Sequence, residues 1–270
     1  MSNTCYNHFM NIIFPELKNQ IINQAIAEYN SEHEDAPISP ISADNLEDAC
    51  AKLVAPENSA LIAGIDYTTR DVVLACKDSL GMADGVKTFS SCFVLHNENA
   101  KNASLKTLIL ADAGVTKNPT ADQLYDIVLQ TYNTATKVLN DVPRIAMLSF
   151  SSFGSAKDDS IVKINTVINK IRADYPGIII DGEMQLDCAI NPEIADKKAP
   201  NSTVAGSANV LIVPDLNSGN ILYKALEQFG GYTAAGPILQ GFKKPVSDLS
   251  RGSTIDDVKL VIETMVKLVG

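Results

Sequence analysis

Several features that mark particular classes of protein are absent from this 270-residue chain. Its three histidines, His8, His33 and His96, lack the spacing of a zinc site, and no acidic metal-binding cluster is evident. The five cysteines form no paired metal or redox motif, so we expect reduced thiols, and we expect Cys76 and Cys92 to pack as small hydrophobic side chains. They are Cys5, Cys50, Cys76, Cys92 and Cys188. The sequence therefore predicts neither a metal nor a redox cofactor.

A surplus of basic residues is also absent. The formal net charge is −10 at pH 7, which argues against nucleic acid or an anionic membrane surface as a partner. An anion site in such a chain must be built locally from a few basic side chains and backbone N–H groups. No G-x-G-x-x-G motif opens a helix, which disfavours a dehydrogenase.

Long apolar runs are missing as well. The segment MSNTCYNHFMNIIFPELKNQ has neither a basic start nor a sustained apolar stretch, so we expect no signal peptide and no membrane span. Hydrophobic residues make up 46% and charged residues 20% of the chain, which is typical of globular proteins. We therefore predict a globular, cytoplasmic protein.

Short apolar runs alternate with amphipathic segments along most of the sequence. SALIAGI predicts a strand, and TTRDVVLACKDSLG predicts a helix that ends near Gly81. Further strands are expected at TFSSCFVLH, KTLILADA, RIAMLSFSS, GIIIDGEMQ and VLIVPDL. Further helices are expected at ADQLYDIVLQTYNTATKVLN, IVKINTVINKIRAD and GNILYKALEQFG. This alternation predicts an α/β fold with an open, mainly parallel sheet, whose ligands bind beyond the carboxyl ends of the strands.

The N-terminal part follows a different pattern. Apolar residues including Phe9, Ile12 and Ile13 recur at helical spacing, so Met1 to Asn30 is predicted as an amphipathic helix or helix pair broken near Pro15. A polar turn around Pro37 and Pro40 is expected next, followed by a helix in SADNLEDACAKL, capped by Ser42 or Asp44.

The loops after the later strands are rich in Ser, Gly, Asn and Asp. They contain SFSSFGSA, DGEMQLD, VAGSANVLIVPDLNSGNILYK and GPILQGFKKPVSDLSRGS, and such loops can present N–H groups and hydroxyls to a phosphate. In this order, these strings resemble the phosphate acetyltransferase family, which also includes phosphate butyryltransferases. The resemblance covers Arg144 to Asp257, extends more weakly back to AGIDYTT, and is closer to the acetyl branch.

This resemblance implies two open α/β domains of the isocitrate/isopropylmalate dehydrogenase-like type, with the active site in an interdomain cleft. Domain I would comprise residues 1–84 plus 238–270, and domain II residues 85–237. A homodimer is also implied, for which helices such as Ile161 to Ile171 offer apolar faces. The reaction implied joins coenzyme A and acetyl phosphate to give acetyl-coenzyme A and phosphate, with coenzyme A as a substrate and not a cofactor.

By the same resemblance, three residues of SRGSTIDD are catalytic. Asp257 is the base that takes the thiol proton, Arg251 binds the phosphate, and Ser250 donates a hydrogen bond to the acyl phosphate. From the residues alone, Asp256 could equally be the base, Asp257 could serve only its helix, Ser250 could cap a turn and Arg251 could form a surface ion pair.

Further residues are expected to contact substrate. Ser149, Ser151, Ser152, Gly154 and Ser155 form a loop between a strand and a helix, where a phosphate or pantetheine group could lie. The other candidates for substrate binding are Thr68, Thr69, Arg70, Asn209, Asn220, Tyr223, Lys224, Gln240 and Gly241.

The N-terminal third departs from the family pattern, because an early segment with its own arginine is missing. A basic residue of the family also aligns with Leu74 in this chain, whereas Arg70 lies one helical turn earlier on the same face. Arg70 could replace the missing positive charge or could simply be solvated. Alternatives to acetyl transfer are therefore a longer acyl group, as in phosphate butyryltransferases, or a non-catalytic protein that binds coenzyme A or phosphate.

Overall fold

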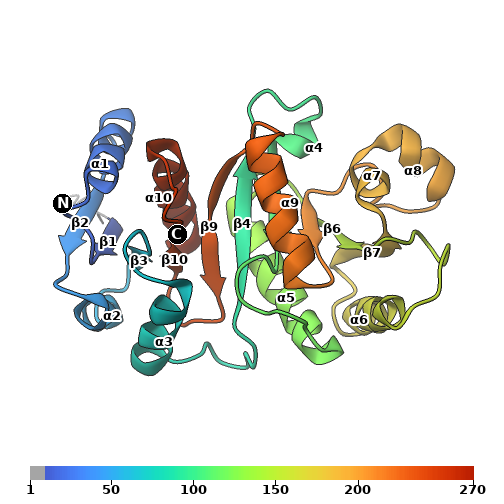
Figure 1. Cartoon of the computed structure of the whole chain (residues 1–270), viewed down its shortest axis with the longest axis horizontal. Coiled ribbons are helices and arrows are strands. Elements are labelled where there is room, and N and C mark those ends of the chain that lie inside the picture. Colours follow the sequence, from blue (N-terminus) through green and yellow to red (C-terminus); the bar gives the residue numbers. More distant parts are fainter. Residues whose placement is uncertain (1–9) are drawn as a thin grey trace, which may run out of the picture. The chain divides into compact units, whose positions relative to one another are not determined.

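The computed structural model describes residues 10–270 of the chain. Contacts divide the chain into two compact units: unit 1 contains the residues up to Gly81 together with Phe242–Gly270, and unit 2 contains Met82–Gly241. Both units have the α/β composition that the alternating pattern predicted (Figure 1). No helix in the described part of the chain is long and apolar enough to cross a membrane.

Unit 1 contains a parallel sheet with helices on both faces. Helix α1 (Gln20–Glu32) connects β1 (Met10–Phe14) to β2 (Ile38–Ser42), and α2 (Leu46–Val54) connects β2 back past β1 to β3 (Ser59–Ala63). Because right-handed crossovers in opposite directions put their helices on opposite sides of a sheet, α1 and α2 lie on opposite faces. α10 packs against α1, and α3 packs against α2. In spatial order the strands are β2 (Ile38–Ser42), β1 (Met10–Phe14), β3 (Ser59–Ala63) and β10 (Val246–Asp248). The helices are α1 (Gln20–Glu32), α2 (Leu46–Val54), α3 (Thr69–Leu80) and α10 (Ile255–Val269).

The N-terminal prediction was partly wrong. Ile12 and Ile13 lie in β1, and the residues around Pro40 form β2 where a polar turn was expected. The five-residue segment MNIIF, in which four residues are apolar, is too short to distinguish a helix from a strand by periodicity. β2 is an edge strand of unit 1, which is where a sheet tolerates proline. The part of the predicted helix before Met10 lies outside the described residues.

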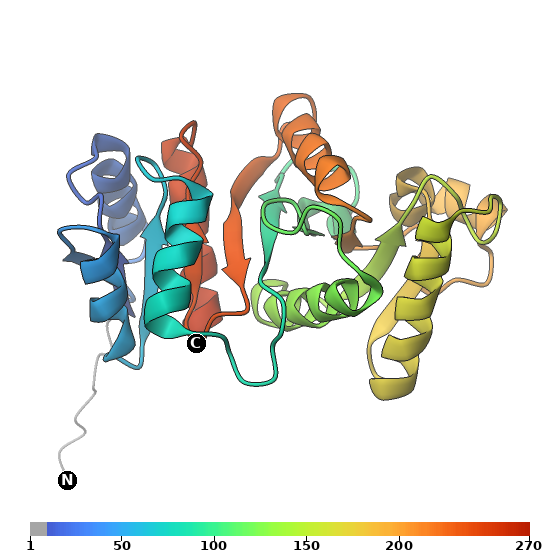
Figure 2. The same ribbon diagram turned by 60° about the horizontal axis from the view of Figure 1, so that its bottom comes forward.

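Unit 2 contains a mixed sheet. β5, β8, β6 and β7 run parallel, whereas β4 is antiparallel to both β5 and β9. A core of Phe93, Leu110, Leu211 and other apolar side chains lies between this sheet and α7, α8 and α9, and α5 and α6 pack against the other face (Figure 2). In spatial order the strands are β9 (Thr233–Gln240), β4 (Ser90–His96), β5 (Thr107–Ala111), β8 (Val210–Ile212), β6 (Arg144–Leu148) and β7 (Ile179–Met184). The helices are α4 (Ala103–Lys106), α5 (Ala121–Val138), α6 (Asp159–Asp174), α7 (Leu186–Ile190), α8 (Pro192–Lys198) and α9 (Leu216–Gln228).

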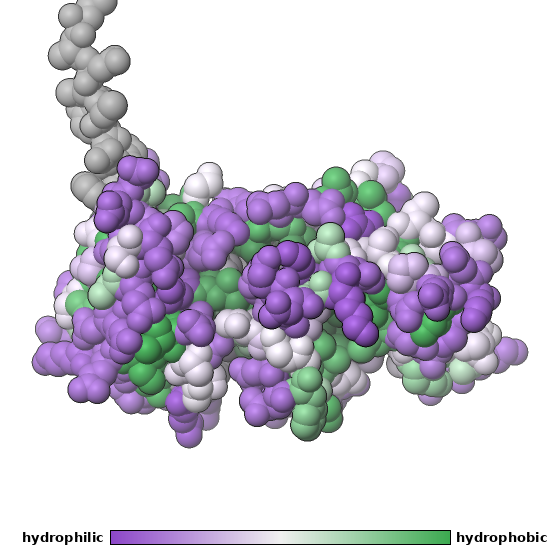
Figure 3. Space-filling model, turned by 90° about the horizontal axis from the view of Figure 1, so that it is seen from above, coloured by the Kyte–Doolittle hydropathy of each residue, from purple (hydrophilic) through white to green (hydrophobic). Residues whose placement is uncertain are grey.

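The apolar face of α6 is not available for the predicted dimer contact. Ile161, Ile164, Ile168 and Ile171 are buried within unit 2, and α6 packs on α5 and β7. These side chains therefore serve the core. The surface drawn in Figure 3 is mostly hydrophilic, and its hydrophobic side chains lie in small separate areas.

Candidate active site

One edge of the unit 1 sheet collects the predicted residues of this unit. β1, β3 and β10 run parallel, with Leu61 beside both Ile13 and Val246, so their carboxyl ends lie at the same edge. The segments that leave this edge begin α3 after β3 and α10 after β10. They carry Thr68, Thr69, Arg70, Ser250, Arg251 and Asp257. The fold therefore brings two distant stretches of sequence to the edge where α/β sheets bind ligands.

Asp257 lies in the first turn of α10, as expected. Its side chain is 7% exposed, and its Oδ2 accepts hydrogen bonds from the backbone N–H and the Oγ1 of Thr254, both at 2.8 Å. The Asp257 N–H donates back to Thr254 Oγ1 at 3.2 Å, which completes a capping box. The carboxylate therefore stabilises the helix start, whether or not it also acts on a substrate. Asp256, its neighbour, is exposed.

Ser250 and Arg251 form the turn between β10 and α10. Ser250 Oγ accepts the Gly252 N–H at 3.3 Å, and its carbonyl accepts the Ser253 N–H at 2.9 Å. Ser250 thus does cap a turn, and the side chains of Ser250 and Arg251 are both exposed.

The four arginines of the chain fall into two classes. Arg144 pairs with Asp141 at 2.8 Å and Arg172 with Asp181 at 2.7 Å. Arg70 and Arg251 are exposed, and within residues 10–270 neither has an ion-pair partner. The surface ion pair considered for Arg251 is therefore not formed with any described residue. These two guanidinium groups are the ones that remain available to an anion.

The hydroxyls of Thr68 and Thr69 are held by carboxylates. Thr68 Oγ1 donates to Asp71 Oδ2 at 2.7 Å, within the capping box of α3. Thr69 Oγ1 donates to Asp248 Oδ2 at 2.5 Å. Because each hydroxyl has one hydrogen, neither hydroxyl can also donate to a ligand, and the Asp71 N–H is bound by Thr68 Oγ1. The N–H groups that the helix start can offer to a ligand are therefore those of Thr69 and Arg70.

Two buried acids that sequence reasoning missed lie beneath this segment. Glu16 accepts the N–H of Gly64 at 2.8 Å and also the N–H of Asp66, and Asp248 holds Thr69. Burial raises the pKa of Glu16, although the two backbone hydrogen bonds oppose this. Burial also raises the pKa of Asp248 to about 6, with a smaller contribution from the negative charge of Glu16. No sequence signal marks Asp248, because β10 has a single apolar residue, Val246, and the burial of the acid depends on the pairing of β10 with β3.

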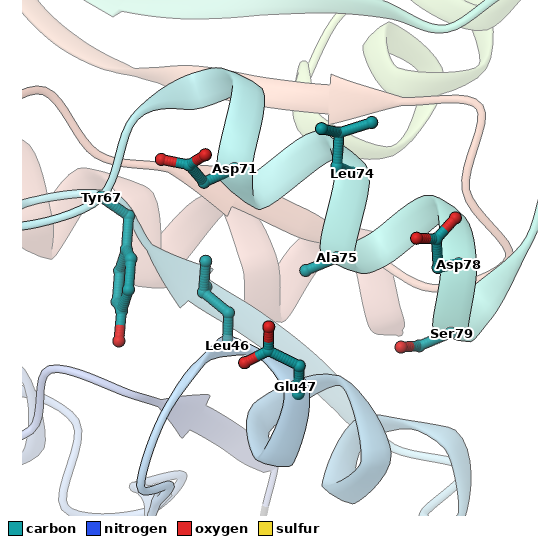
Figure 4. Close-up of a pocket in the computed structure, with 8 residues that line it drawn as sticks. All are labelled: Leu46, Glu47, Tyr67, Asp71, Leu74, Ala75, Asp78 and Ser79. Carbon is teal, nitrogen blue, oxygen red and sulfur yellow. The ribbon is translucent and has the colours of Figure 1, made fainter.

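A pocket of about 420 Å³ lies between α2 and α3 (Figure 4). Its lining includes three carboxylates, Glu47, Asp71 and Asp78, together with the apolar Leu46 and Leu74. Leu74, at the position where the family resemblance implies a basic residue, adds no charge to offset them. Such a lining repels phosphate groups, so this pocket does not suit coenzyme A or an acyl phosphate.

In unit 2 the serine-rich loop after β6 is organised by Glu183, which is buried. Glu183 Oε1 accepts from Ser151 Oγ at 2.9 Å and from the Gly154 N–H at 2.8 Å, and its Oε2 accepts from Asn165 Nδ2 at 3.1 Å. The Phe153 N–H donates to the backbone carbonyl of Glu183 at 2.9 Å. Burial alone would raise the pKa of Glu183, but these hydrogen bonds outweigh it and hold the pKa below its usual range. Sequence reasoning missed this acid too, although it lies in DGEMQLD.

The other serines of this loop also make internal contacts. Ser155 Oγ lies 3.0 Å from Ser151 Oγ and accepts the Ser152 N–H at 3.0 Å. Ser152 Oγ accepts the Gln185 N–H at 3.0 Å, and Ser149 Oγ accepts the Ser151 N–H at 3.4 Å. Ser151 and Ser152 are buried, whereas Gly154 and Ser155 are exposed. The exposed tip of the loop is therefore the part that a ligand can reach.

Three predicted residues of unit 2 use their side chains inside the unit. Asn209 precedes β8 and bonds the Arg144 N–H and the Val142 carbonyl, at the opposite end of these strands from the serine loop. Gln240 bonds Ser90, Thr131 and Thr134 in the interior. Tyr223 is buried and stacks on Phe93, with ring centroids 4.0 Å apart.

The remaining predicted residues lie at or near the surface of unit 2. Asn220 is half-buried on α9, and Lys224 is exposed with its Nζ 4.7 Å from the centroid of the Tyr223 ring. Gly241 ends the unit with φ +99° and accepts the Ala83 N–H at 2.9 Å.

Cys76 and Cys92 are buried, as expected for small hydrophobic side chains, and Cys50 and Cys188 are buried too. Cys50 and Cys76 approach each other with their Sγ atoms 3.7 Å apart. Among residues 10–270, no group of three or more His, Cys, Asp or Glu side chains could hold a metal ion.

Comparison with known proteins adds independent information. Residues 39–266 match the family model described as phosphate acetyl/butaryl transferase. A phosphate acetyltransferase of Clostridium acetobutylicum is 43% identical over 202 residues, which are 75% of this chain and 61% of that protein. One from Thermoanaerobacterium thermosaccharolyticum is 39% identical over 221 residues, 82% of this chain and 67% of that protein. The chain thus spans about three fifths to two thirds of the length of these relatives.

Solved structures agree with this comparison. The crystal structure of a phosphotransacetylase from Streptococcus pyogenes superposes with a TM-score of 0.80 at 29% identity, covering 97% of this chain and 94% of that one. The EutD phosphotransacetylase from Staphylococcus aureus gives a TM-score of 0.78 at 26% identity, with the same coverage.

Proposed function

Since the chain belongs to the phosphate acetyl/butaryl transferase family, we propose that it transfers an acetyl group between acetyl phosphate and coenzyme A. The observation that carries this proposal is the pair of arginines, Arg70 and Arg251. They are exposed on segments from one sheet edge of unit 1, and neither has an ion-pair partner in the part of the chain described. A dianionic phosphoryl group is the kind of ligand that such cations bind.

Three residues of the SRGSTIDD segment have a chemical task in this proposal. The thiol of coenzyme A attacks the acyl carbon, and the C–O bond to phosphate breaks. A thiol of pKa ~8.5 is only slightly ionised at neutral pH, so Asp257 assists by accepting its proton. Arg251 stabilises the charge on the departing phosphate, and the Ser250 hydroxyl donates to the acyl phosphate.

Assays of the purified chain test this function directly. Coenzyme A should accelerate the loss of acetyl phosphate, with stoichiometric formation of a thioester. Butyryl phosphate in the same assay tests the longer-chain alternative. Binding of coenzyme A without transfer from any short acyl phosphate would contradict the enzyme proposal and favour the non-catalytic alternative.

The role of Asp257 needs a control for its place in the capping box. Asp257→Asn should lower turnover by about 100-fold or more while coenzyme A binding changes little. Thr254→Ala removes the same helix cap, which is worth about 1 kcal/mol, but leaves the base. Near-wild-type turnover of Thr254→Ala beside a strong loss in Asp257→Asn would separate catalysis from capping. Equal losses in both variants would contradict the proposed base, and Asp256 would be tested next.

Arg251→Ala should weaken the use of acetyl phosphate and lower turnover, because it removes charge-assisted hydrogen bonds. Higher pH supplies more thiolate, so it should partly rescue Asp257→Asn but not Arg251→Ala. Rescue of both variants to the same extent would contradict the division of roles.

The setting proposed for this activity is a cytoplasmic homodimer that needs no metal or redox cofactor. The dimer follows from the family resemblance alone, since the apolar face of α6 is buried within unit 2. Light scattering at micromolar concentration tests it, and a monomeric mass would contradict it.

A further inference from the structure

Asp248 is a buried acid with one unexplained oxygen. It ends β10 and is 2% exposed. Its Oδ2 accepts the Thr69 hydroxyl at 2.5 Å, whereas its Oδ1 has no hydrogen-bond partner among the described residues. Leaving a buried carboxylate oxygen without a donor is unfavourable, so a role beyond packing is needed to explain this residue.

The backbone around Asp248 is shaped to accommodate this carboxylate. Gly64 has φ +117°, and a Cβ there would lie 2.3 Å from Asp248 Oδ1 and 2.6 Å from the Leu249 nitrogen. The loop that starts at Gly64 therefore passes directly over the carboxylate. Glu16 binds the start of this loop at Gly64 and Asp66, and Asp248 binds its end at Thr69.

The position of Asp248 in the chain connects the two segments that carry the available arginines. Arg70 follows Thr69 in the first turn of α3, and Arg251 lies three residues after Asp248. The Thr69–Asp248 hydrogen bond joins residues 179 positions apart in sequence. It is a direct side-chain link between the start of α3 and the strand that leads into the Ser250–Arg251 turn.

We infer that Asp248 is a positioning residue, which acts through Thr69 to hold the first turn of α3 and Arg70 in place beside the Ser250–Arg251 turn. This inference rests on the proposed acyl transfer. Asp248 touches no reacting atom in this account, and its effect should appear mainly in the use of the phosphate-bearing substrate.

Protonation of Asp248 should weaken this hold. A neutral carboxyl group accepts the Thr69 hydrogen bond less strongly than a carboxylate. Of the titratable groups around Asp248, Glu16 reaches the same loop from the end of β1, and Cys76 faces it from α3. Of these, Glu16 is the acid whose charge favours protonation of Asp248.

The first test compares Asp248→Asn with Asp78→Asn, which removes one exposed charge from the same unit. Asp248→Asn should raise the KM for acetyl phosphate about tenfold, equivalent to about 1.4 kcal/mol, with a smaller change in the KM for coenzyme A. Asp78→Asn should resemble wild type. Equal kinetics in the two variants would overturn the inference and leave the proposed function standing.

A second test asks whether Asp248 acts through Thr69. Thr69→Val should have the same effect as Asp248→Asn, and Thr69→Ser, which keeps the hydroxyl, should have a smaller effect than Thr69→Val. The double variant Asp248→Asn/Thr69→Val should be no worse than either single one. Additive losses would overturn this route.

The third test uses pH and amide hydrogen exchange. In wild type, kcat/KM for acetyl phosphate should fall as the pH drops through about 6, and Asp248→Asn should lack the part of this fall that Asp248 causes. Protonation of the substrate affects both proteins equally. The same pH dependence of kcat/KM in wild type and in Asp248→Asn would therefore overturn the inference. Exchange of residues 64–70 should also be faster in Asp248→Asn than in Asp78→Asn. If wild type shows no transfer at all, the proposed function fails, and unchanged exchange would separately rule out the positioning contact.

Discussion

Replacing Glu183 by alanine should loosen the serine loop of unit 2 without unfolding the unit. The buried carboxylate accepts hydrogen bonds from Ser151, Gly154 and Asn165. A hydrogen bond to a charged group contributes about 1.5–3 kcal/mol, and each buried donor left unpaired adds a cost. Because relaxation and water recover part of this, we expect a local loss of about 3–5 kcal/mol in Glu183→Ala.

Hydrogen exchange followed by mass spectrometry measures this local loss directly. Peptides that cover residues 149–156 should exchange about 150- to 5,000-fold faster in Glu183→Ala than in wild type, while peptides of α5 should change little. Glu193→Gln, at an exposed acid of the same unit, serves as the control. Glu183→Gln should lie in between, because its carbonyl can still serve Ser151 and Gly154 while its amide nitrogen faces Asn165. Wild-type exchange of the loop in Glu183→Ala would refute the account of Glu183 as its organiser.

Three further predictions follow from unit 1 and from the composition. Burial raises the pKa of Asp248 from 3.8 to about 6, so the folded state binds its proton more tightly than the unfolded state does. The free energy of unfolding therefore falls by about 3 kcal/mol as the pH rises from about 4 to about 6. The urea midpoint of Asp248→Asn, measured relative to wild type, should consequently be higher at pH 7 than at pH 4. Gly64→Ala should cost at least about 2 kcal/mol, since it adds a clash to an unfavourable φ, whereas Gly81→Ala, with φ +69° and open space around it, should cost less in the same urea titration. Chelator treatment should leave transfer activity unchanged, and a loss that one divalent metal restores would contradict the expectation of a metal-free enzyme.

Local patterns were sufficient for most of the fold. The helix after the paired threonines, the strand at SALIAGI and the alternation through the second half appear where they were predicted, because short apolar runs there are bounded by turn residues and alternate with longer amphipathic segments. The predicted caps of α2 at Ser42 or Asp44 missed the observed cap, Asn45, by one residue or more. The first strand was taken for a helix because the four apolar residues of MNIIF fit either pattern.

The site was less predictable, because its supporting residues depend on pairing between distant segments. Glu16 reaches a loop 48 residues away, and Asp248 reaches a threonine 179 residues away. No local motif marks such an acid as buried, since the same residue in a solvated loop would look identical in sequence. For the same reason Asn209 and Gln240 looked like exposed polar candidates, although their amides bond within unit 2.

The negative net charge of this chain is compatible with binding an anion because of where its acids point. Glu16, Asp112, Glu183 and Asp257 all accept backbone N–H groups, so part of their charge is directed into loops and helix starts. Such hydrogen bonds offset the negative potential of each carboxylate locally. Within the described residues of unit 1, Arg251 and Arg70 have no ion-pair partner, so no carboxylate offsets their positive charge. At the sheet edge the local balance of charge therefore depends on which groups are already paired, and a net charge of −10 does not exclude a phosphate ligand there.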